Sequence, residues 1–386
     1  MAFDRPRAAV TAAGFCAFLD LYAPQAVLPQ LADSFHISPA VAGGMVGIST
    51  LAVALSAPFV GMAVDRLGRK PTIVGAALLL IIPTVMLMLA NSLDQIMVWR
   101  FFQGVFLPAI FSATVAYVSE EYPPDEASSI IGLYIAGSAL GGFSGRFVTA
   151  MMAEHYGWRS GFAALTLATL ASAAMIWAWL PAGHKGGHVT ARVPALTALK
   201  DHLTNPSLMA TCLAGSALLF SMVATFTYVN FHLAAPPFSM GPAALGMIFL
   251  VYLIGAAITP ATGMLIQRLG RRGAFVLALA TSCSGLILSL LPSLTAIIIG
   301  LALFVTGIFI AQSSATGFVG QAARIAKPAA VGLYVCCYYL GGSAGAVVPG
   351  WLVWSWGGWA GCVGLTVLVL GASAAVAFRA WRVKAV

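Results

Sequence analysis

The sequence predicts an all-α membrane protein with twelve transmembrane helices, arranged as two similar six-helix bundles. Three observations lead to this fold class: a composition poor in charge, twelve long apolar segments, and motifs that recur about 200 residues apart. Of the 386 residues, 60% are hydrophobic and only 8% are charged, whereas an ordinary soluble domain carries roughly 25% charged residues. Most of the protein surface is therefore expected to face lipid.

Twelve apolar segments are long enough to cross a bilayer. Because a helix rises about 1.5 Å per residue and the hydrocarbon core is about 30 Å thick, roughly 20 apolar residues span it. The first segment is too long for a signal-peptide core and lacks a cleavage site, so it is expected to be retained. The segments fall at 8–31, 39–64, 72–90, 96–119, 128–153, 160–180, 206–233, 242–266, 274–291, 295–320, 329–355 and 360–378.

Lysine and arginine in the loops predict the orientation, because cytoplasmic loops carry an excess of both. Of the 19 basic residues, Arg100 and Arg146 lie within spans and Arg159 lies on the side away from the termini, which leaves 16 on the side of the termini. Both termini are therefore expected to be cytoplasmic. The net charge of +8 is then a topology signal, and the lipid bilayer rather than a nucleic acid is the expected partner.

The two halves repeat each other. The stretch GLYIAGSALGGFSG at 132–145 matches GLYVCCYYLGGSAG at 332–345, and GMAVDRLGRK at 61–70 is echoed by GMLIQRLGRR at 263–272. A duplicated six-helix unit is typical of transporters whose halves rock about a central site. We therefore expect an N-terminal bundle at 1–180, a cytoplasmic linker at 181–205 and a C-terminal bundle at 206–386.

Three motifs resemble those of the major facilitator superfamily, most closely its bacterial twelve-helix drug:proton antiporters and arabinose-efflux permeases. The resemblance covers the whole chain and implies the fold of that family, alternating access, a bacterial inner membrane, a monomer and no cofactor. The motifs are Gly61-x-x-x-Asp65-Arg66-x-Gly68-Arg69-Lys70 in loop 2–3, Arg100-x-x-Gln103-Gly104 in helix 4, and Leu19-Asp20 with Pro29 nine residues after the aspartate in helix 1.

The resemblance has departures in helix 5. Of the six positions that define the antiporter motif there, Gly137, Gly141 and Gly145 fit, whereas Ser128, Gly142 and Arg146 do not. The three fitting glycines recur every fourth residue and so line one stripe, which predicts close helix packing. In the second loop motif, Gln267 replaces the aspartate.

In the family, the loop 2–3 motif latches the cytoplasmic side in the outward-facing state. We expect Arg69 to pair with an acid at the end of helix 4, and Asp65 to sit at the N-terminus of a neighbouring helix, where the dipole favours an anion. The alternative is that these are solvated charges that only set the topology. The expected gating residues are Gly61, Asp65, Arg66, Gly68, Arg69, Lys70, Glu120 and Glu121.

Asp20 is the only one of the 11 acidic residues within a predicted span. A charge at the bilayer centre costs about 2.5–3.5 kcal/mol on insertion scales, so it is expected to have a partner and to face the interior. One interpretation is a static salt bridge to an arginine. The other is proton coupling by Asp20 and Arg100, because burial favours the neutral acid and an approaching arginine favours the ionised one.

The balance of charge bears on the solute. With Asp20 ionised the spans carry a net charge of +1, since Arg100 and Arg146 are the two cations. An organic anion or a sugar therefore fits better than a cationic drug, and Arg146 is expected to contact an anionic group. The other expected substrate-binding residues are polar or aromatic: Tyr22, Gln25, Gln103, Tyr134, Tyr228, Asn230, Gln312, Tyr334 and Tyr338.

The predicted function is proton-coupled efflux of a small organic anion, sugar or drug-like molecule. An uptake symporter or facilitator for an organic anion or sugar remains open, as does a non-transporting membrane receptor. No P-loop is present, and the longest loop, of about 25 residues, is too short for a catalytic domain, so we expect no enzyme. No metal is expected either, because His184 and His188 lack a third ligand.

Overall fold

The computed structural model describes residues 4–183, 195–258 and 262–381, and these residues are almost wholly helical, with no strand among them. The chain divides into two compact units. Unit 1 comprises Met1–His188 and Leu233–Phe249, and unit 2 comprises Val189–His232 and Leu250–Val386. Each unit is described by itself below.

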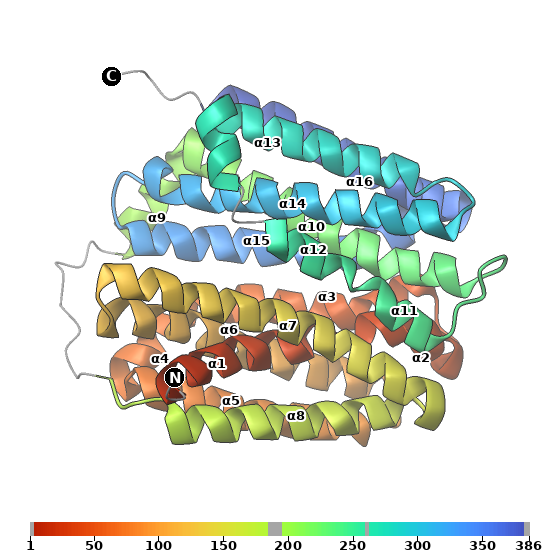
Figure 1. The fold of residues 1–386 in the computed structure, drawn as a ribbon, viewed down its shortest axis with the longest axis horizontal. Coiled ribbons are helices and arrows are strands. Elements are labelled where there is room, and N and C mark those ends of the chain that lie inside the picture. The colour runs from red at the N-terminus through yellow and green to blue at the C-terminus, as the bar shows by residue number, and fades with distance from the viewer. Residues whose placement is uncertain (1–3, 184–194, 259–261, 382–386) are drawn as a thin grey trace. The chain divides into compact units, whose positions relative to one another are not determined.

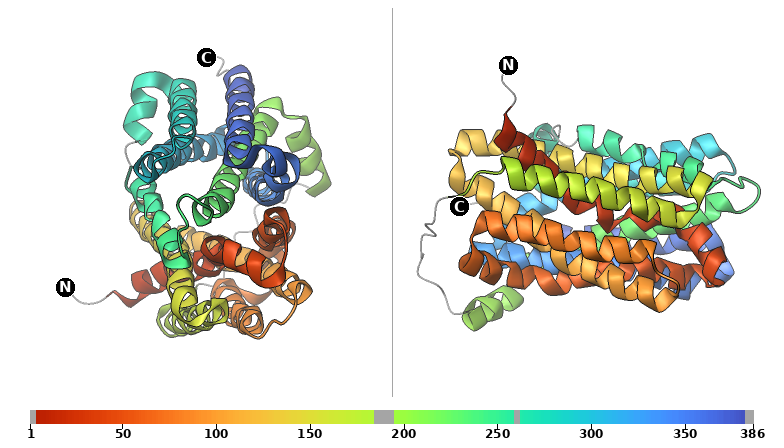
Figure 2. Two further views of the ribbon diagram at one scale, coloured as in Figure 1. Left: turned by 90° about the vertical axis from the view of Figure 1, so that its right-hand side faces the viewer. Right: turned by 90° about the horizontal axis from the view of Figure 1, so that it is seen from below.

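Unit 1 is a bundle of long helical segments that run horizontally in Figure 1 and are seen end on in the left view of Figure 2. Two of the segments are divided by short 3-10 turns. Within the described residues, its elements are α1 (Arg5–Leu21), η1 (Ala23–Val27), α2 (Leu28–Phe35), α3 (Pro39–Ser56), η2 (Ala57–Phe59), α4 (Val60–Leu67), α5 (Arg69–Met88), α6 (Leu93–Glu121), α7 (Pro124–Tyr156), α8 (Trp158–Trp179) and α11 (Pro242–Ile248).

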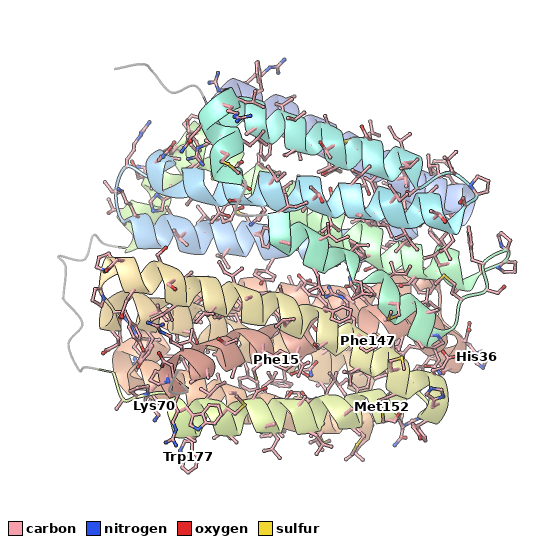
Figure 3. The ribbon with its side chains drawn as sticks, viewed as in Figure 1. Phe15, His36, Lys70, Phe147, Met152 and Trp177 are labelled. Atoms are coloured by element: carbon pink, nitrogen blue, oxygen red, sulfur yellow. The ribbon has the colours of Figure 1, made fainter. Side chains whose placement is uncertain are left out.

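The helices of unit 1 alternate in direction. Figure 3 places Lys70, at the start of α5, and Trp177, in the last turn of α8, at one end of the unit. His36, which follows α2, and Met152, near the end of α7, lie toward the opposite end. Such an up-and-down arrangement is what consecutive spans joined by short loops require.

Proline explains where the first two segments break. Helix 1 changes to the 3-10 turn η1 at Pro24, and helix 2 changes to η2 at Pro58. Proline has no backbone N–H and its ring collides with the carbonyl four residues earlier, so the α-helical hydrogen-bond ladder stops there. The break in helix 1 lies beside Asp20, and it positions the candidate site.

Unit 2 is a second helical bundle, preceded by a short helix from the connecting segment. Its glycine-rich helices α13 and α16 each contain one non-helical glycine, Gly270 and Gly358. Within the described residues, its elements are α9 (Ala195–Thr204), α10 (Pro206–Ala234, of which the last two residues belong to unit 1), α12 (Val251–Ile258), α13 (Thr262–Leu288), α14 (Leu294–Ala322), α15 (Lys327–Pro349), η4 (Gly350–Trp354) and α16 (Ser355–Ala380).

The predicted all-α membrane fold is confirmed. Ten helical stretches of the described residues are long and apolar enough to cross a membrane, and a shorter apolar stretch covers Pro242–Gly255. One of the ten, Ala329–Ala380, contains two predicted spans, which Gly358 separates with a φ of 51°. The predicted span at 242–266 is represented by α11, α12 and the first turns of α13, with residues 259–261 outside the described part.

Equivalent glycine contacts pack neighbouring helices within each unit. In unit 1, a Cβ on Gly141 or Gly145 of α7 would collide with the carbonyl oxygen of Phe15 or Leu19 on α1. In unit 2, Gly341 and Gly345 of α15 press in the same way against the carbonyls of Ser216 and Phe220 on α10. These contacts confirm the close packing expected from the glycine stripe, because backbones approach this closely only where no side chain intervenes.

One segment from the second half of the sequence belongs to unit 1. Helix α11 packs on α7, where Gly246 faces Ala150 with little room for a side chain. The predicted division into bundles at 1–180 and 206–386 with a linker at 181–205 stays a prediction. Residues 184–194 of that linker, with His184 and His188, lie outside the described residues.

Candidate functional site

Asp20 lies in the last turn of α1, fully buried, and neutral groups from three other helices surround its carboxylate. Thr169 of α8 donates a hydrogen bond to Oδ2 at 2.8 Å. Thr84 of α5 and the side-chain amide of Gln103 on α6 approach Oδ1 at 3.3 and 3.4 Å. Hydroxyl and amide donors favour the ionised carboxylate, whereas complete burial favours the neutral acid.

Arg100 of α6 is also fully buried, and it binds the break in helix 1. Because Pro24 has no N–H, the carbonyl of Asp20, four residues earlier, has no helical donor. Arg100 Nη1 donates to that carbonyl at 2.8 Å, and Nη2 donates to the carbonyl of Leu21. Arg100 Nε also donates to the carbonyl of Met45 on α3 at 3.0 Å. The arginine thus satisfies buried backbone acceptors that would otherwise be costly.

Asp20 and Arg100 are neighbours, but in the described structure no nitrogen and oxygen of their side chains lie within the 4.0 Å of a salt bridge. The link between the two side chains is Gln103. Its Oε1 accepts from Arg100 Nη1 at 2.6 Å, and its Nε2 faces Asp20 and Thr84. The carboxylate is therefore close to a cation without being directly neutralised by it.

Arg146 lies in a second buried cluster of unit 1. Its guanidinium carbon lies over two aromatic rings, at 4.8 Å from the centroid of Tyr22 and 4.7 Å from that of Phe249. Nε donates to Gln25 Oε1 at 2.8 Å, and Nη1 donates to the carbonyl of Gly142 at 2.6 Å. The structure thus brings together three of the residues predicted to bind substrate. Tyr22 directly precedes η1, Gln25 lies in η1, and Arg146 lies in α7.

The short helix α11 is fixed to α7 near the same cluster. The Glu154 carboxylate accepts a hydrogen bond from the backbone N–H of Ala243, in the first turn of α11, at 3.1 Å. Phe249, which covers the Arg146 guanidinium, directly follows α11. Two contacts from α7, one at each end of α11, therefore hold this helix against unit 1.

Tyr134 is not part of the Arg146 cluster. Both residues are buried in α7, but they are 12 positions apart, which is about 18 Å along a helix. Tyr134 contacts Gly14, whose missing Cβ would face its carbonyl, and Ser138, whose hydroxyl donates to that carbonyl. Its predicted contact with substrate stays a prediction.

The remaining predicted contacts belong to unit 2. There the Tyr334 hydroxyl donates to Gln312 Oε1 at 3.3 Å, and the ring of Tyr338 stacks on Tyr334 with centroids 6.1 Å apart. Tyr228 is fully buried, with its hydroxyl on the carbonyl of Ala346 at 2.9 Å, which is a packing contact. Asn230 donates to the carbonyl of Phe226 in its own helix at 2.6 Å.

The loop 2–3 motif forms the expected ion pair. Arg69, in the first turn of α5, meets Glu120 at the end of α6 through two nitrogens, with Nε to Oε2 at 2.8 Å and Nη2 to Oε1. Gly68, between α4 and α5, has a φ of 87° that side-chain-bearing residues rarely adopt. The other predicted gating residues are exposed or half-buried: Gly61, Asp65, Arg66, Lys70 and Glu121. Their role as a latch stays a prediction.

Four residues of these clusters were not predicted from the sequence. Thr84 and Thr169 carry no signal, because threonines in membrane helices usually bond their own backbone. Phe249 is one of 22 phenylalanines, and Glu154 belongs to a loop-facing helix end. The sequence did contain a signal for the role of Arg100. Pro24 follows Asp20 by four residues, which predicts that the Asp20 carbonyl lacks its helical donor and needs another one.

A repeated bundle of long apolar helices, with charges buried inside it, defines a polytopic membrane protein of the transporter type. The sequence pattern that describes the Major Facilitator Superfamily matches residues 10–323. The chain belongs to this family, as the relatives below also show.

Relatives of the chain are bacterial transporters. It is 32% identical to the inner membrane transport protein YnfM of Escherichia coli (strain K12) over 98% of this chain and 91% of that protein. It is also 32% identical to the uncharacterized MFS-type transporter YybF of Bacillus subtilis (strain 168), over 93% and 89%. Among solved structures, it shares the fold of a bacterial homologue of the human lysosomal transporter Spinster in an inward-facing, unoccupied conformation. The TM-score is 0.78 at 16% identity, over 98% of this chain and 97% of that one.

Proposed function

We propose that the protein is a secondary active transporter of a bacterial inner membrane that couples proton movement to the export of a small organic solute. The observation that carries the proposal is the environment of Asp20. Its carboxylate is fully buried and is held by hydroxyl and amide donors from α5, α6 and α8. A carboxylate held by neutral groups can exist in both protonation states, since neither state breaks an ion pair.

The separation of the Arg100 guanidinium from the Asp20 carboxylate supports the role of Asp20 as the proton site. An arginine in direct contact would hold the carboxylate ionised, whereas here the guanidinium binds backbone carbonyls of helix 1 and reaches the carboxylate through Gln103. A helix movement that changed this spacing would change the proton affinity of Asp20. Alternating access supplies such movements, and protonation would then be linked to the side to which the site opens.

Arg146 supports an anionic solute. It is 2% exposed, and its guanidinium carbon lies over the rings of both Tyr22 and Phe249. A planar guanidinium held in one orientation suits the two oxygens of a carboxylate. We therefore propose an organic anion as the solute, with a sugar as the neutral alternative, and place Arg146 with Tyr22 and Gln25 in contact with it.

The proposal is tested in energised, everted membrane vesicles with a pH-sensitive dye. Organic acids, sugars and cationic drugs are added one at a time to vesicles containing the wild type or Asp20→Asn. Proton antiport predicts that one class of compound discharges the pH gradient with the wild type and not with the variant. A response that is equal in both would show that Asp20 is not the proton site.

The solute class is tested in the same vesicles with Arg146→Ala and a matched control, Arg159→Ala. Arg159 lies at the end of the bundle and binds the carbonyl of Ala90, so its loss should leave solute preference unchanged. If Arg146 contacts an anion, its loss should weaken the response to organic acids at least tenfold. An unaltered response to the same acid would exclude this contact.

Uptake is a second candidate, and Arg146 is the observation in its favour. It occupies a position at which the antiporter motif of helix 5 has glycine, so the signature of an exporter is incomplete. Uptake of labelled organic acids into right-side-out vesicles, driven by an inward proton gradient, would indicate a symporter. Uptake without any gradient dependence would indicate a facilitator.

A further inference from the structure

We propose that Gln103 is a positioning residue for proton exchange: it fixes the hydrogen-bond donors that face Asp20 and links them to Arg100. The inference rests on the proposed proton role of Asp20. Gln103 thereby belongs to the proton site, although the sequence predicted a contact with substrate. Gln103 is fully buried and lies one turn after Arg100 on α6.

The first step is the orientation of the Gln103 amide. Arginine has only donors, so the atom of Gln103 that lies 2.6 Å from Arg100 Nη1 must be the oxygen. The amide nitrogen then necessarily faces the opposite way, toward Asp20 and Thr84. Arg100 itself cannot turn, because it is bound to the carbonyls of Asp20, Leu21 and Met45. The backbone at the break of helix 1 thereby sets the direction of the amide.

The second step concerns the hydroxyl of Thr84. It lies 2.8 Å from the carbonyl of Leu80 and 3.3 Å from Asp20 Oδ1, and it has one proton for these two acceptors. Gln103 Nε2 donates to the Thr84 oxygen at 2.8 Å and approaches Asp20 Oδ1 at 3.4 Å. Gln103 therefore supports the ionised carboxylate directly, and it occupies the acceptor side of Thr84 so that this hydroxyl must donate elsewhere.

Together these contacts give the site two arrangements. When Asp20 is ionised, the Thr84 proton and a Gln103 proton point at Oδ1. When Asp20 binds a proton, the Thr84 proton can return to the carbonyl of Leu80, and the Gln103 amide keeps its bond to Thr84. One amide thus connects the group whose charge changes to Arg100, and Arg100 in turn binds the break of helix 1.

The groups that face Asp20 limit the alternatives. From α6 the charged group is Arg100, and from α1 itself the titratable group is the thiol of Cys16, one turn earlier. From α5 and α8 come the hydroxyls of Thr84 and Thr169. Helix α7 presents Gly141 and Gly145 to α1, which carry no titratable group. Within the described residues, Gln103 is therefore the side chain that connects the acid to the cation.

The experiment titrates Asp20 directly, without a solute. Infrared difference spectra of the purified full chain in lipid nanodiscs are recorded over a range of pH for the wild type, Asp20→Asn and Gln103→Met. We expect a carboxylic acid C=O band that is absent from Asp20→Asn. Because Gln103→Met removes donors to the ionised form, the midpoint of that band should move to higher pH by roughly half to one unit, the value of one net hydrogen bond.

The control is Gln25→Met, which replaces another buried glutamine of unit 1. Gln25 binds Arg146 rather than Asp20, so its replacement should leave the midpoint in place. Gln103→Leu serves in place of Gln103→Met if the methionine variant does not fold. An equal shift in the Gln25 and Gln103 variants, or no shift in either, would overturn the positioning role. Absence of any Asp20-dependent band in the wild type would instead overturn the proposed function.

Discussion

The two units share their packing but differ in the polar groups of their interiors. In unit 1, Gly145 lies against the carbonyl of Leu19, and in unit 2 Gly345 lies against that of Phe220. These contacts make Leu19 and Phe220 equivalent, so the residue that follows in each helix is equivalent too. It is Asp20 in unit 1 and Ser221 in unit 2.

The same comparison extends to the other members of the Asp20 site. Helices α6 and α14 both have 29 residues, and the eighth residue is Arg100 in one and Leu301 in the other. Gly157 and Gly358 both have positive φ at the start of the last span of their unit, and 12 residues later stand Thr169 and Leu370. Leu301 and Leu370 are fully buried, so apolar packing replaces the polar network in unit 2.

This difference separates what the repeated fold needs from what the proposed chemistry needs. Glycine contacts and turn glycines occur in both units, since each bundle has to pack and each chain reversal has to close. Asp20 and Arg100 occur in unit 1. So does Pro24, which breaks helix 1 and leaves the carbonyls that Arg100 binds. We therefore propose that proton exchange takes place in unit 1 alone.

Arg100 provides the largest expected effect. Arg100→Met would leave the buried carbonyls of Asp20 and Leu21 and the side-chain oxygen of Gln103 without this donor, and each buried unsatisfied group costs about 1–3 kcal/mol. We expect the loss of several kcal/mol of stability, seen as a strongly lowered thermal midpoint in detergent, and loss of transport. Leu301→Met, at the equivalent position of unit 2, is volume-conserving and should cost about 1.5 kcal/mol or less. Equal losses in both variants would remove the distinction between the units.

The glycine stripe predicts an intermediate effect that is the same in both units. Gly145→Ala and Gly345→Ala each place a methyl group on a carbonyl oxygen of the neighbouring helix, and overpacking of this kind costs about 1–3 kcal/mol. Gly142→Ala is the control, because its Cβ would have its nearest neighbour at 3.5 Å, an ordinary contact. Thermal midpoints that fall for Gly145→Ala and Gly142→Ala alike would contradict the packing role of the stripe.

The smallest effect on stability is expected at the loop motifs. Arg69 pairs with Glu120, whereas its counterpart Arg271 donates to the carbonyl of Ser314 at 2.7 Å. The Arg69 and Glu120 side chains are 22% and 48% exposed, so the pair contributes about 1 kcal/mol or less to stability. We expect Arg69→Glu to slow transport and the double variant Arg69→Glu, Glu120→Arg to restore much of it, with thermal midpoints nearly unchanged.

The charges cannot be exchanged in this way at Arg271, because its hydrogen-bond acceptor is the backbone carbonyl of Ser314. Arg271→Glu should therefore lose function without a charge-reversal rescue. A failure of the Arg69–Glu120 exchange to recover any transport would indicate that the pair is a solvated charge cluster that only sets topology.

The fold could be predicted because long apolar segments, separated by loops rich in lysine and arginine, can be recognised directly in the sequence. Asp20, Arg100 and Arg146 followed as well, since charges within spans are rare and stand out. Of the residues around these charges, Gln103, Tyr22 and Gln25 were among the predicted candidates, whereas Thr84, Thr169 and Phe249 were not. Thr84 and Thr169 look like any threonine of a membrane helix, and the position of Phe249 over Arg146 depends on α11, a segment from the other half of the sequence, packing on α7. Sequence spacing carries no information on such a contact.

The most direct test of the account separates proton coupling from transport itself. Purified wild type, Asp20→Asn and the matched variant Ser221→Ala are reconstituted in liposomes, and the solute identified in the vesicle assay is followed in two modes. Exchange of solute for solute needs no proton, whereas accumulation against a gradient does. We predict that Asp20→Asn keeps exchange and loses accumulation driven by a pH gradient, while Ser221→Ala keeps both. Accumulation by Asp20→Asn at the wild-type level, or loss of exchange together with accumulation, would contradict the assignment of the proton site to Asp20.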